Sequence, residues 1–221
     1  MKAMDSNQEI IKCIIAALEA KDRCLFEHSL HTAFIAQEIA RILLTEGLKH
    51  SLPEREEIMH AAIVHDIGKL NIPDMILQKS GSLTERELET IKFHPLWGAQ
   101  FLMKIPSMGQ FSVYTHQHHE TPDGCGYPCR LKVDDIHPVA RLINICDRFS
   151  AMTMDRPYRK AIDSDYAVSM IEKDIELFFG GKNKKSITQS LLSIHKSEHV
   201  FYDELQGWHT ERQILRFPGG K

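Results

Sequence analysis

Histidines are the residues of this 221-residue chain that are best placed to do chemistry, and there are 13 of them. His118 and His119 are adjacent and are followed by Glu120 and a glycine-rich segment. His65 is followed directly by Asp66 at the predicted end of a helix. Imidazole and carboxylate groups are ligands of divalent transition metals. These positions therefore point first to a metal site.

Other polar side chains occupy positions that the pattern of apolar residues predicts to be buried. His28 shares a helix face with Ile35 and Ile39, Asp147 lies in a strongly apolar helix, and His94 stands between two helices. A buried charged group needs a partner or a metal ion. Taken singly, these residues also fit ordinary roles, such as a hydrogen-bonded core histidine, a helix cap or an aspartate paired with a nearby arginine.

Taken together, these polar groups are hard to satisfy separately in one core. The set comprises five histidines and two aspartates: His28, His65, Asp66, His94, His118, His119 and Asp147. Seven ligands are too many for one tetrahedral ion and suit two ions bridged by a carboxylate. Cys125 and Cys129 are four residues apart, as zinc ligands can be, but the sequence holds no second cysteine pair to complete such a site.

The elements that must position these residues are predicted to be helices. Helical apolar spacing covers residues 7–20, 24–46, 53–65, 84–93, 95–101, 107–119, 138–155 and 163–179. Thr84 and Glu87 have capping-box spacing at one helix start. No segment sustains a two-residue alternation, so we predict an all-α, multi-helix domain. Residues 121–136 are expected to form a glycine-rich loop, with at most a short hairpin at 127–136.

The overall composition excludes several classes of protein. Lys and Arg total 27 and Asp and Glu total 30, so the formal charge of −3 argues against binding to polymeric nucleic acid. A hydrophobic content of 43% argues against disorder. No apolar run is long enough for a membrane segment. The N-terminal residues show no export signal, which predicts a cytoplasmic location with free thiols.

Five segments carry motifs in a fixed order: FEHSLHTAFIAQEIA, AAIVHDIGKLNIPDMILQKSGSLTERE, FHPLWGAQFL, HQHHETPDGCGYP and ARLINICDRFSAMTMDRPYRKA. In this order and spacing they closely resemble the HD-GYP family, the branch of the HD phosphohydrolases associated with cyclic dinucleotide hydrolysis. The Gly126-Tyr127-Pro128 triplet matches the second half of the family name. The resemblance covers roughly residues 25–178 and implies an HD-domain helical bundle.

The resemblance implies a role for each candidate ligand. The ligands shared by HD phosphohydrolases match His28, His65, Asp66 and Asp147. The histidines that build the family's second metal site match His94, His118 and His119. Asp66 would bridge two ions, most often iron or manganese, with zinc, nickel or cobalt as alternatives. Cys24 stands where some members carry a glutamate that binds a third ion, so we expect two ions only.

The resemblance also implies a substrate and a reaction. Lys69 matches the lysine near the scissile phosphate, and Arg156 and Arg159 match basic residues that contact substrate phosphates. We therefore expect hydrolysis of cyclic di-GMP or cyclic GMP-AMP to a linear dinucleotide or to mononucleotides. A hydroxide bridging the two ions would attack phosphorus, and Lys69 would stabilise the developing charge or protonate the leaving 3′-oxygen. The Gly126-Tyr127-Pro128 loop is a candidate contact for a signalling protein.

Some assignments stay open at this level. The chain is also compatible with a cyclic-dinucleotide sensor that does not cleave, or with an HD-type di-iron oxygenase. His31 and His116 are near-site residues of open role, and His195 and His199 are expected on an exposed helix face.

The expected organisation has three parts: an N-terminal helix at 1–23, a catalytic domain at 24–180, and a helical extension with a tail at 181–221. The last part has no functional interpretation. The chain is either a stand-alone enzyme or part of a longer regulated protein.

Overall fold

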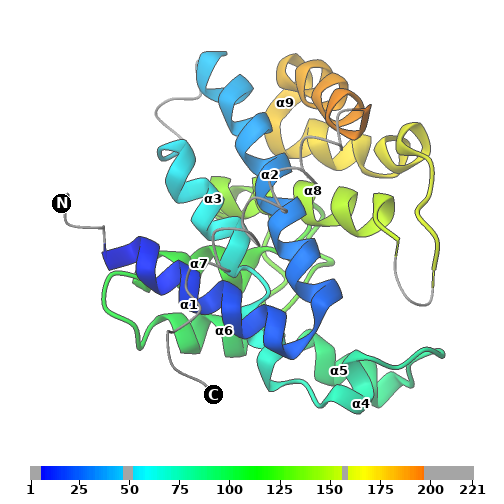
Figure 1. Cartoon of the computed structure of the whole chain (residues 1–221). Helices are drawn as coiled ribbons and strands as arrows, with labels where there is room; N and C mark the ends of the chain where they lie inside the picture. The colour runs from blue at the N-terminus through cyan, green and yellow to red at the C-terminus, as the bar shows by residue number, and fades with distance from the viewer. Residues whose placement is uncertain (1–5, 47–51, 156–158, 197–221) are drawn as a thin grey trace, which may run out of the picture.

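The polypeptide forms a bundle of helices, shown in Figure 1 from a computed structural model. The structure describes residues 6–46, 52–155 and 159–196. Within these ranges no β-strand is present, and the all-α prediction is confirmed. None of the described helices combines the length and the apolar character needed to cross a bilayer.

Helix α2 (Arg23–Thr45) is the central element of the bundle (Figure 1). It contacts four other helices: α1 (Ser6–Lys21), α3 (Arg55–Val64), α8 (Pro138–Thr153) and α9 (Ser164–Lys196). Its start is fixed by Asp22, whose carboxylate accepts a hydrogen bond from Leu25 N at 2.8 Å. Its inward face carries fully buried side chains at helical spacing, among them Ile35, Ile39 and Leu43.

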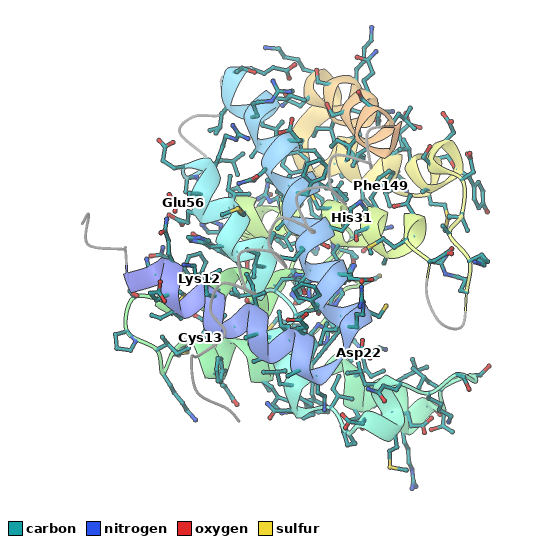
Figure 2. All side chains as sticks on the ribbon, viewed as in Figure 1. Lys12, Cys13, Asp22, His31, Glu56 and Phe149 are labelled. Carbon is teal, nitrogen blue, oxygen red and sulfur yellow. The ribbon has the colours of Figure 1, made fainter. Side chains whose placement is uncertain are left out.

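Helix α1 packs against α2 and α3 and contributes Ile11, Ile15 and Leu18 to the same apolar core. Figure 2 shows Lys12 and Cys13 on the outer side of this helix, whereas His31 of α2 and Phe149 of α8 are buried inside the bundle. The division of the chain at residues 23 and 180 stays a prediction.

Short helices connect α3 to α8 along the chain. They are η2 (Ile67–Asn71), α4 (Asp74–Leu77), α5 (Glu85–Lys92), α6 (His94–Leu102) and α7 (Gly109–Gln117). Helix α5 begins with the predicted capping box: Glu87 N donates to Thr84 Oγ1, and Thr84 N donates to the Glu87 carboxylate at 2.7 Å. Helix η2 approaches α6 so closely that a Cβ on Gly68 would lie 1.9 Å from His94 O. Glycine is therefore required where these two segments meet.

The hairpin allowed for residues 127–136 is not formed. This segment consists of turns and the short helix η3 (Val133–Asp135). The physical reason is that Cys129 N and Leu131 N donate to the buried carboxylate of Glu120, at 2.6 and 2.8 Å, instead of to a neighbouring strand.

Helices α8 and α9 complete the bundle. Helix α9 is interrupted at Gly180, whose φ of 79° and ψ of 157° are not helical. The predicted helix at 163–179 therefore ends where expected, and a second helical part follows to Lys196. The rest of the predicted helical extension and tail, residues 197–221, lies outside the described residues.

Candidate metal centre

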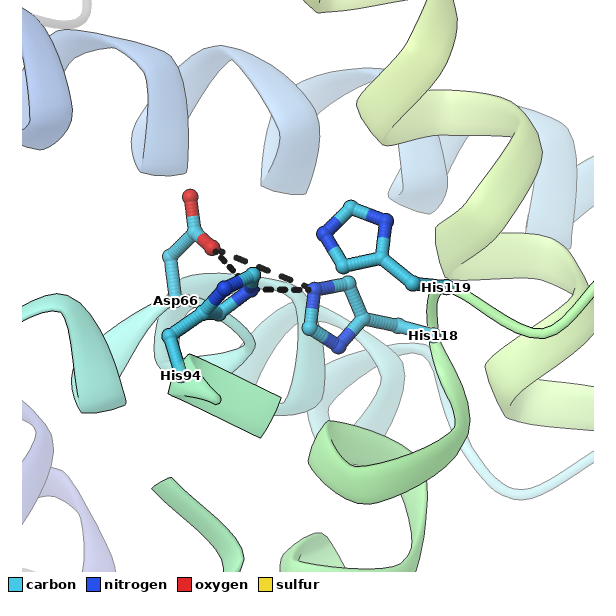
Figure 3. A group of neighbouring side chains, drawn as sticks. All are labelled: Asp66, His94, His118 and His119. Carbon is cyan, nitrogen blue, oxygen red and sulfur yellow. Dashed lines mark hydrogen bonds and ion pairs between the residues drawn. The ribbon is translucent and has the colours of Figure 1, made fainter. Parts of the chain in front are cut away.

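All seven candidate ligands converge in the interior of the bundle. Their ligand atoms fall into two groups, and the atoms within each group lie within 4.8 Å of one another. One group is shown in Figure 3 and comprises Asp66, His94, His118 and His119. The other comprises His28, His65 and Asp147. Helices α2, α3, α6, α7 and α8 each supply part of this arrangement at an inward face or at a helix end.

Helix ends orient three of the histidines in the same way. The Nδ1 atom of each ring lies against the carbonyl oxygen three residues earlier, at 2.6 Å in His65, 2.8 Å in His94 and 2.6 Å in His118. A carbonyl oxygen only accepts hydrogen bonds, so Nδ1 carries the proton in these contacts. The Nε2 atoms are left to face the centre, as those of metal-ligating histidines do.

The carboxylate of Asp66 lies between the two groups. Its Oδ1 is 3.1 Å from His94 Nε2 and 3.9 Å from His118 Nε2. Its Oδ2 is 3.3 Å from His65 Nε2 and 3.9 Å from His28 Nε2. Each oxygen of one carboxylate thus faces a different set of imidazoles.

The two aspartates of the centre are held in the ionised form. Burial raises the pKa of Asp66, but Lys69 and His65 outweigh burial and hold this pKa well below its usual range. Burial likewise raises the pKa of Asp147, but the hydrogen bond from His28 and the nearby imidazole of His65 hold it well below its usual range. Both carboxylates therefore carry negative charge at neutral pH.

The histidines differ in protonation. Burial lowers the pKa of His118 well below its usual value and that of His119 to about 3, so both rings are neutral. Burial also lowers the pKa of His65, but the Asp66 and Asp147 carboxylates raise it to about 10. Without a metal ion, a proton on His65 thus offsets part of the negative charge of the centre.

Two buried atoms of the centre have no hydrogen-bond partner within the described residues: His65 Nε2 and Asp66 Oδ1. Buried polar groups are nearly always hydrogen-bonded, so such orphans require an explanation. One is an imidazole nitrogen and the other a carboxylate oxygen, and they belong to different groups. A divalent transition metal in each group would satisfy both atoms, so the donor set fits a pair of ions.

The arginine partner considered for Asp147 is not used. Arg148 pairs with Asp174, and Arg141 donates to a backbone carbonyl oxygen at 2.7 Å. Instead, Asp147 Oδ1 lies 2.8 Å from His28 Nε2.

Ser150 of α8 connects His28 to a second histidine. Its Oγ lies 2.9 Å from His28 Nδ1 and 3.0 Å from His31 Nδ1. His31 is buried and is therefore linked to a candidate ligand through one hydroxyl. His116 belongs to neither ligand group, and the side chain of His195 and the whole of His199 lie outside the described residues.

Lys69 lies at the edge of the centre. Its Nζ contacts Asp66 Oδ2 at 2.5 Å. It also lines a cavity of about 430 Å³ that reaches the ligands. Other residues that line this cavity are His28, His94, His119, Tyr127, Asp147 and Arg159. An anion placed over the ligands would meet this ammonium group.

Arg159 lines the same cavity, but its guanidinium is already engaged. It donates to the carbonyl oxygens of Ala151 and Met152 at the end of α8, the latter at 3.1 Å. The side chain therefore closes this helix end as well as facing the cavity. Arg156 lies outside the described residues.

The loop that carries the Gly-Tyr-Pro triplet crosses the ligand segment. A Cβ on Gly126 would lie 2.4 Å from Thr121 N and 2.6 Å from His119 O, so the crossing requires glycine. Tyr127 N donates to His119 O at 3.2 Å. The Tyr127 ring stacks on the His119 ring, and Lys92 Nζ lies 5.9 Å from the Tyr127 ring centroid. The loop thus contacts the centre directly.

Two supporting residues received no role from the sequence. Glu120 is buried and anchors the loop through Cys129 N and Leu131 N. Asn144 Nδ2 donates to His118 O at 2.9 Å and to Glu120 O at 3.1 Å. The signal that could have identified Asn144 is a polar amide inside an apolar helix, three residues before a ligand.

A model of the HD domain family matches residues 12–182 of the chain. The chain is 33% identical over 169 residues to the 3′3′-cGAMP-specific phosphodiesterase 3 of Vibrio cholerae, covering 75% of this chain and 36% of that protein. It is 34% identical over 157 residues to the cyclic di-GMP phosphodiesterase PA4108 of Pseudomonas aeruginosa, covering 70% and 36%. The chain thus spans about a third of the length of these relatives.

Among solved structures, the HD domain of the phosphodiesterase PgpH from L. monocytogenes is similar to this fold. The TM-score is 0.61 at 17% identity, and the match covers 84% of this chain and 98% of that one. The sequence-based resemblance to the HD phosphohydrolases is confirmed by these matches.

Proposed function

The chain belongs to the HD domain family, and from that premise we propose that it is a metal-dependent phosphodiesterase that hydrolyses a cyclic dinucleotide. The observation that carries this proposal is the position of Asp66. Its two carboxylate oxygens face two separate groups of imidazoles, and both groups include a buried atom without a hydrogen-bond partner in the described structure. A shared carboxylate of this kind is typical of centres that hold two ions for hydrolysis.

The seven ligands would hold two divalent ions, with iron or manganese as our proposal for their identity. Such a pair supplies Lewis acidity: it acidifies a water molecule and offsets the negative charge of a phosphodiester. Neutral imidazoles and carboxylates of this kind suit both metals. Cys24 stands where a third carboxylate ligand would be needed, so we propose two ions and not three.

Lys69 would act on the leaving group. Its Nζ lies at the ligand Asp66 and lines the cavity, so it can donate a hydrogen bond to a phosphate oxygen. In the reaction, water adds to phosphorus and the bond from phosphorus to O3′ breaks. The 3′-oxygen takes a proton, which the Lys69 ammonium would donate. The product would be a linear dinucleotide with a 5′-phosphate, open to a second cut to mononucleotides.

The substrate class is proposed from the relatives. Their names specify 3′3′-cGAMP in one case and cyclic di-GMP in another, and we propose that this chain accepts one or both. Arg159, facing the same cavity, would lie near a substrate phosphate. We also propose a cytoplasmic location and a signalling partner that contacts the Gly126–Pro128 loop.

The test is hydrolysis by purified protein reconstituted anaerobically with Mn²⁺ or Fe²⁺. Cyclic di-GMP and cyclic GMP-AMP are supplied separately, and products are separated by liquid chromatography. We expect the linear dinucleotide to appear in at least one reaction. Intact substrate under every metal, with tight binding, would identify a sensor instead. Oxygen consumption without hydrolysis would identify an oxygenase.

A further inference from the structure

A second cavity, of about 760 Å³, adjoins the metal centre. It lies between the start of α2, represented by Cys24 and Leu25, and the α4–α5 region, and we call it the α2–α5 cavity. Lys69 and Ile91 line both this cavity and the one that reaches the ligands. Lys69 Nζ also contacts the candidate ligand Asp66, so this side chain lies between the ligands and the α2–α5 cavity. A molecule held at the ligands can therefore extend past Lys69 into that cavity.

Apolar side chains form a large part of the cavity wall. Ile76, Leu83 and Ile91 line it and are only partly buried by the protein itself. Leu88 also lines it and is 46% exposed. Leaving such surface in water forgoes hydrophobic stabilisation. A flat, weakly hydrated ring would cover it.

Polar groups at the rim of the cavity are unused. The side chains of Gln78, Ser80 and Ser82 line it and make no hydrogen bond within the described part of the chain. By contrast, Lys79 in the same stretch is held by Glu87 at 2.7 Å. An amide such as that of Gln78 offers a donor and an acceptor side by side, which matches the edge of a nucleobase.

We infer that the α2–α5 cavity is the subsite for one purine base of the substrate, an inference that rests on the proposed function. The volume lies within the range of small-molecule sites. The phosphate would sit at the ligands beside Lys69, and the attached nucleoside would pass this side chain. The base would then lie against Leu88 and Ile91, with its edge facing Gln78. This cavity would therefore determine affinity for the dinucleotide without taking part in bond cleavage.

The first variant is Leu88→Ala, which removes apolar wall from the cavity. Its matched control is Leu177→Ala, because Leu177 is 48% exposed on α9 and lines neither cavity. The dissociation constant is measured by titration calorimetry with the hydrolysis-resistant phosphorothioate analogue of cyclic di-GMP. Leu88→Ala should weaken binding about five-fold or more, the size expected for lost apolar contact in a pocket. Leu177→Ala should bind as the unmodified protein does.

The second variant is Gly81→Trp, which adds bulk to the cavity wall. Its matched control is Gly109→Trp, because a Cβ at either glycine meets no atom within 4 Å and Gly109 lines neither cavity. Gly81→Trp should weaken binding of the same analogue, or tighten it if the indole stacks on the base. In either case the binding constant should change about five-fold or more, whereas Gly109→Trp should leave it unchanged.

A substrate without a base separates this inference from the proposed function. Diethyl phosphate has a phosphodiester but no ring that could enter the cavity, so Leu88→Ala and Gly81→Trp should hydrolyse it as the unmodified protein does, with the same metal content. Unchanged binding of the analogue by both variants would overturn the subsite. The unmodified protein could also fail to hydrolyse either substrate while the variants still alter binding of the analogue. That result would overturn the proposed activity alone. Failure of the unmodified protein to bind the analogue or cyclic GMP-AMP would overturn the subsite and the substrate class together.

Discussion

Tyr127 stacks on His119, with ring centroids 4.7 Å apart and 24° between the ring planes. The same two residues are joined by the hydrogen bond from Tyr127 N to His119 O. His119 is the candidate ligand with the greatest exposure of its side chain, since it is only half-buried. Tyr127 of the loop thus covers one face of the His119 ring, which the helices leave exposed. We conclude that the tyrosine of the triplet fixes the orientation of this imidazole.

Replacement of Tyr127 by alanine should therefore weaken metal binding at the group that contains His119. Loss of supporting contacts around a ligand typically costs about 10- to 100-fold in metal affinity. The measurement is titration of metal-free protein with Mn²⁺. Tyr127→Phe is the control, because it keeps the ring and should bind as the unmodified protein does. Equal weakening in both variants would mean that the hydroxyl and not the ring is responsible.

Asp66→Ala should remove most of the bound metal and all hydrolysis, because one carboxylate serves both groups. Asp147→Ala is the comparison, since Asp147 belongs to one group only. Metal content by plasma mass spectrometry should fall further in the first variant than in the second. Circular dichroism checks that both remain helical. Two ions per chain in folded Asp66→Ala protein would refute the shared-ligand scheme.

Lys69→Met should leave the metal content unchanged and lower kcat about 100-fold or more, since it removes a charged donor at the phosphate. Methionine keeps most of the length of the lysine side chain and removes its charge. The readout is kcat together with metal content and KM for the cyclic dinucleotide. A rise in KM with unchanged kcat would assign Lys69 to substrate binding only.

Gly126→Ala should destabilise the fold, because the added methyl group would lie 2.4 Å from Thr121 N. A clash of this kind typically costs about 1–3 kcal/mol. The matched control is Gly109→Ala, where a Cβ meets no atom within 4 Å. The midpoint of thermal unfolding should fall for the first variant and not for the second. Equal midpoints would show that the loop accommodates the added methyl group without loss of stability.

Metal binding should strengthen as pH rises. Burial lowers the pKa of His65, but Asp66 and Asp147 raise it to about 10. In the metal-free protein, protonation of His65 adds to the free energy of unfolding. This contribution is complete below the ordinary histidine pKa of about 6.5 and is lost as the pH rises through the pKa of His65 in the folded protein. A ligand must be deprotonated, so an ion has to displace this proton.

The measurement for this pH effect is the increase in the unfolding midpoint that Mn²⁺ produces. That increase should be larger at about pH 8.5 than at about pH 6. Calorimetry in two buffers of different ionisation enthalpy should also show proton release on binding. An increase that is the same at both pH values would contradict the assignment of His65 as a ligand.

Most of the helices could be predicted from residue order. Thr84 and Glu87 form the capping box that their spacing predicts. Gly180 interrupts the last helix where the polar break begins. The short hairpin that the sequence allowed at 127–136 does not form, because backbone N–H groups of this segment donate to Glu120, a residue outside it. Local patterns are reliable where the decisive contacts are local, and they fail where a distant side chain competes for the backbone.

The sequence by itself determined which residue types are available for chemistry and that helix faces and ends carry them. It did so because helical periodicity and capping depend on neighbours a few residues apart. Only the tertiary structure decided that Asp66 shares its oxygens between two groups, that Tyr127 supports His119, and that Leu88 lines a second cavity. His28 and Asp147, 119 residues apart, meet at 2.8 Å. A separation of that length is closed by the packing of whole helices, which no local pattern encodes.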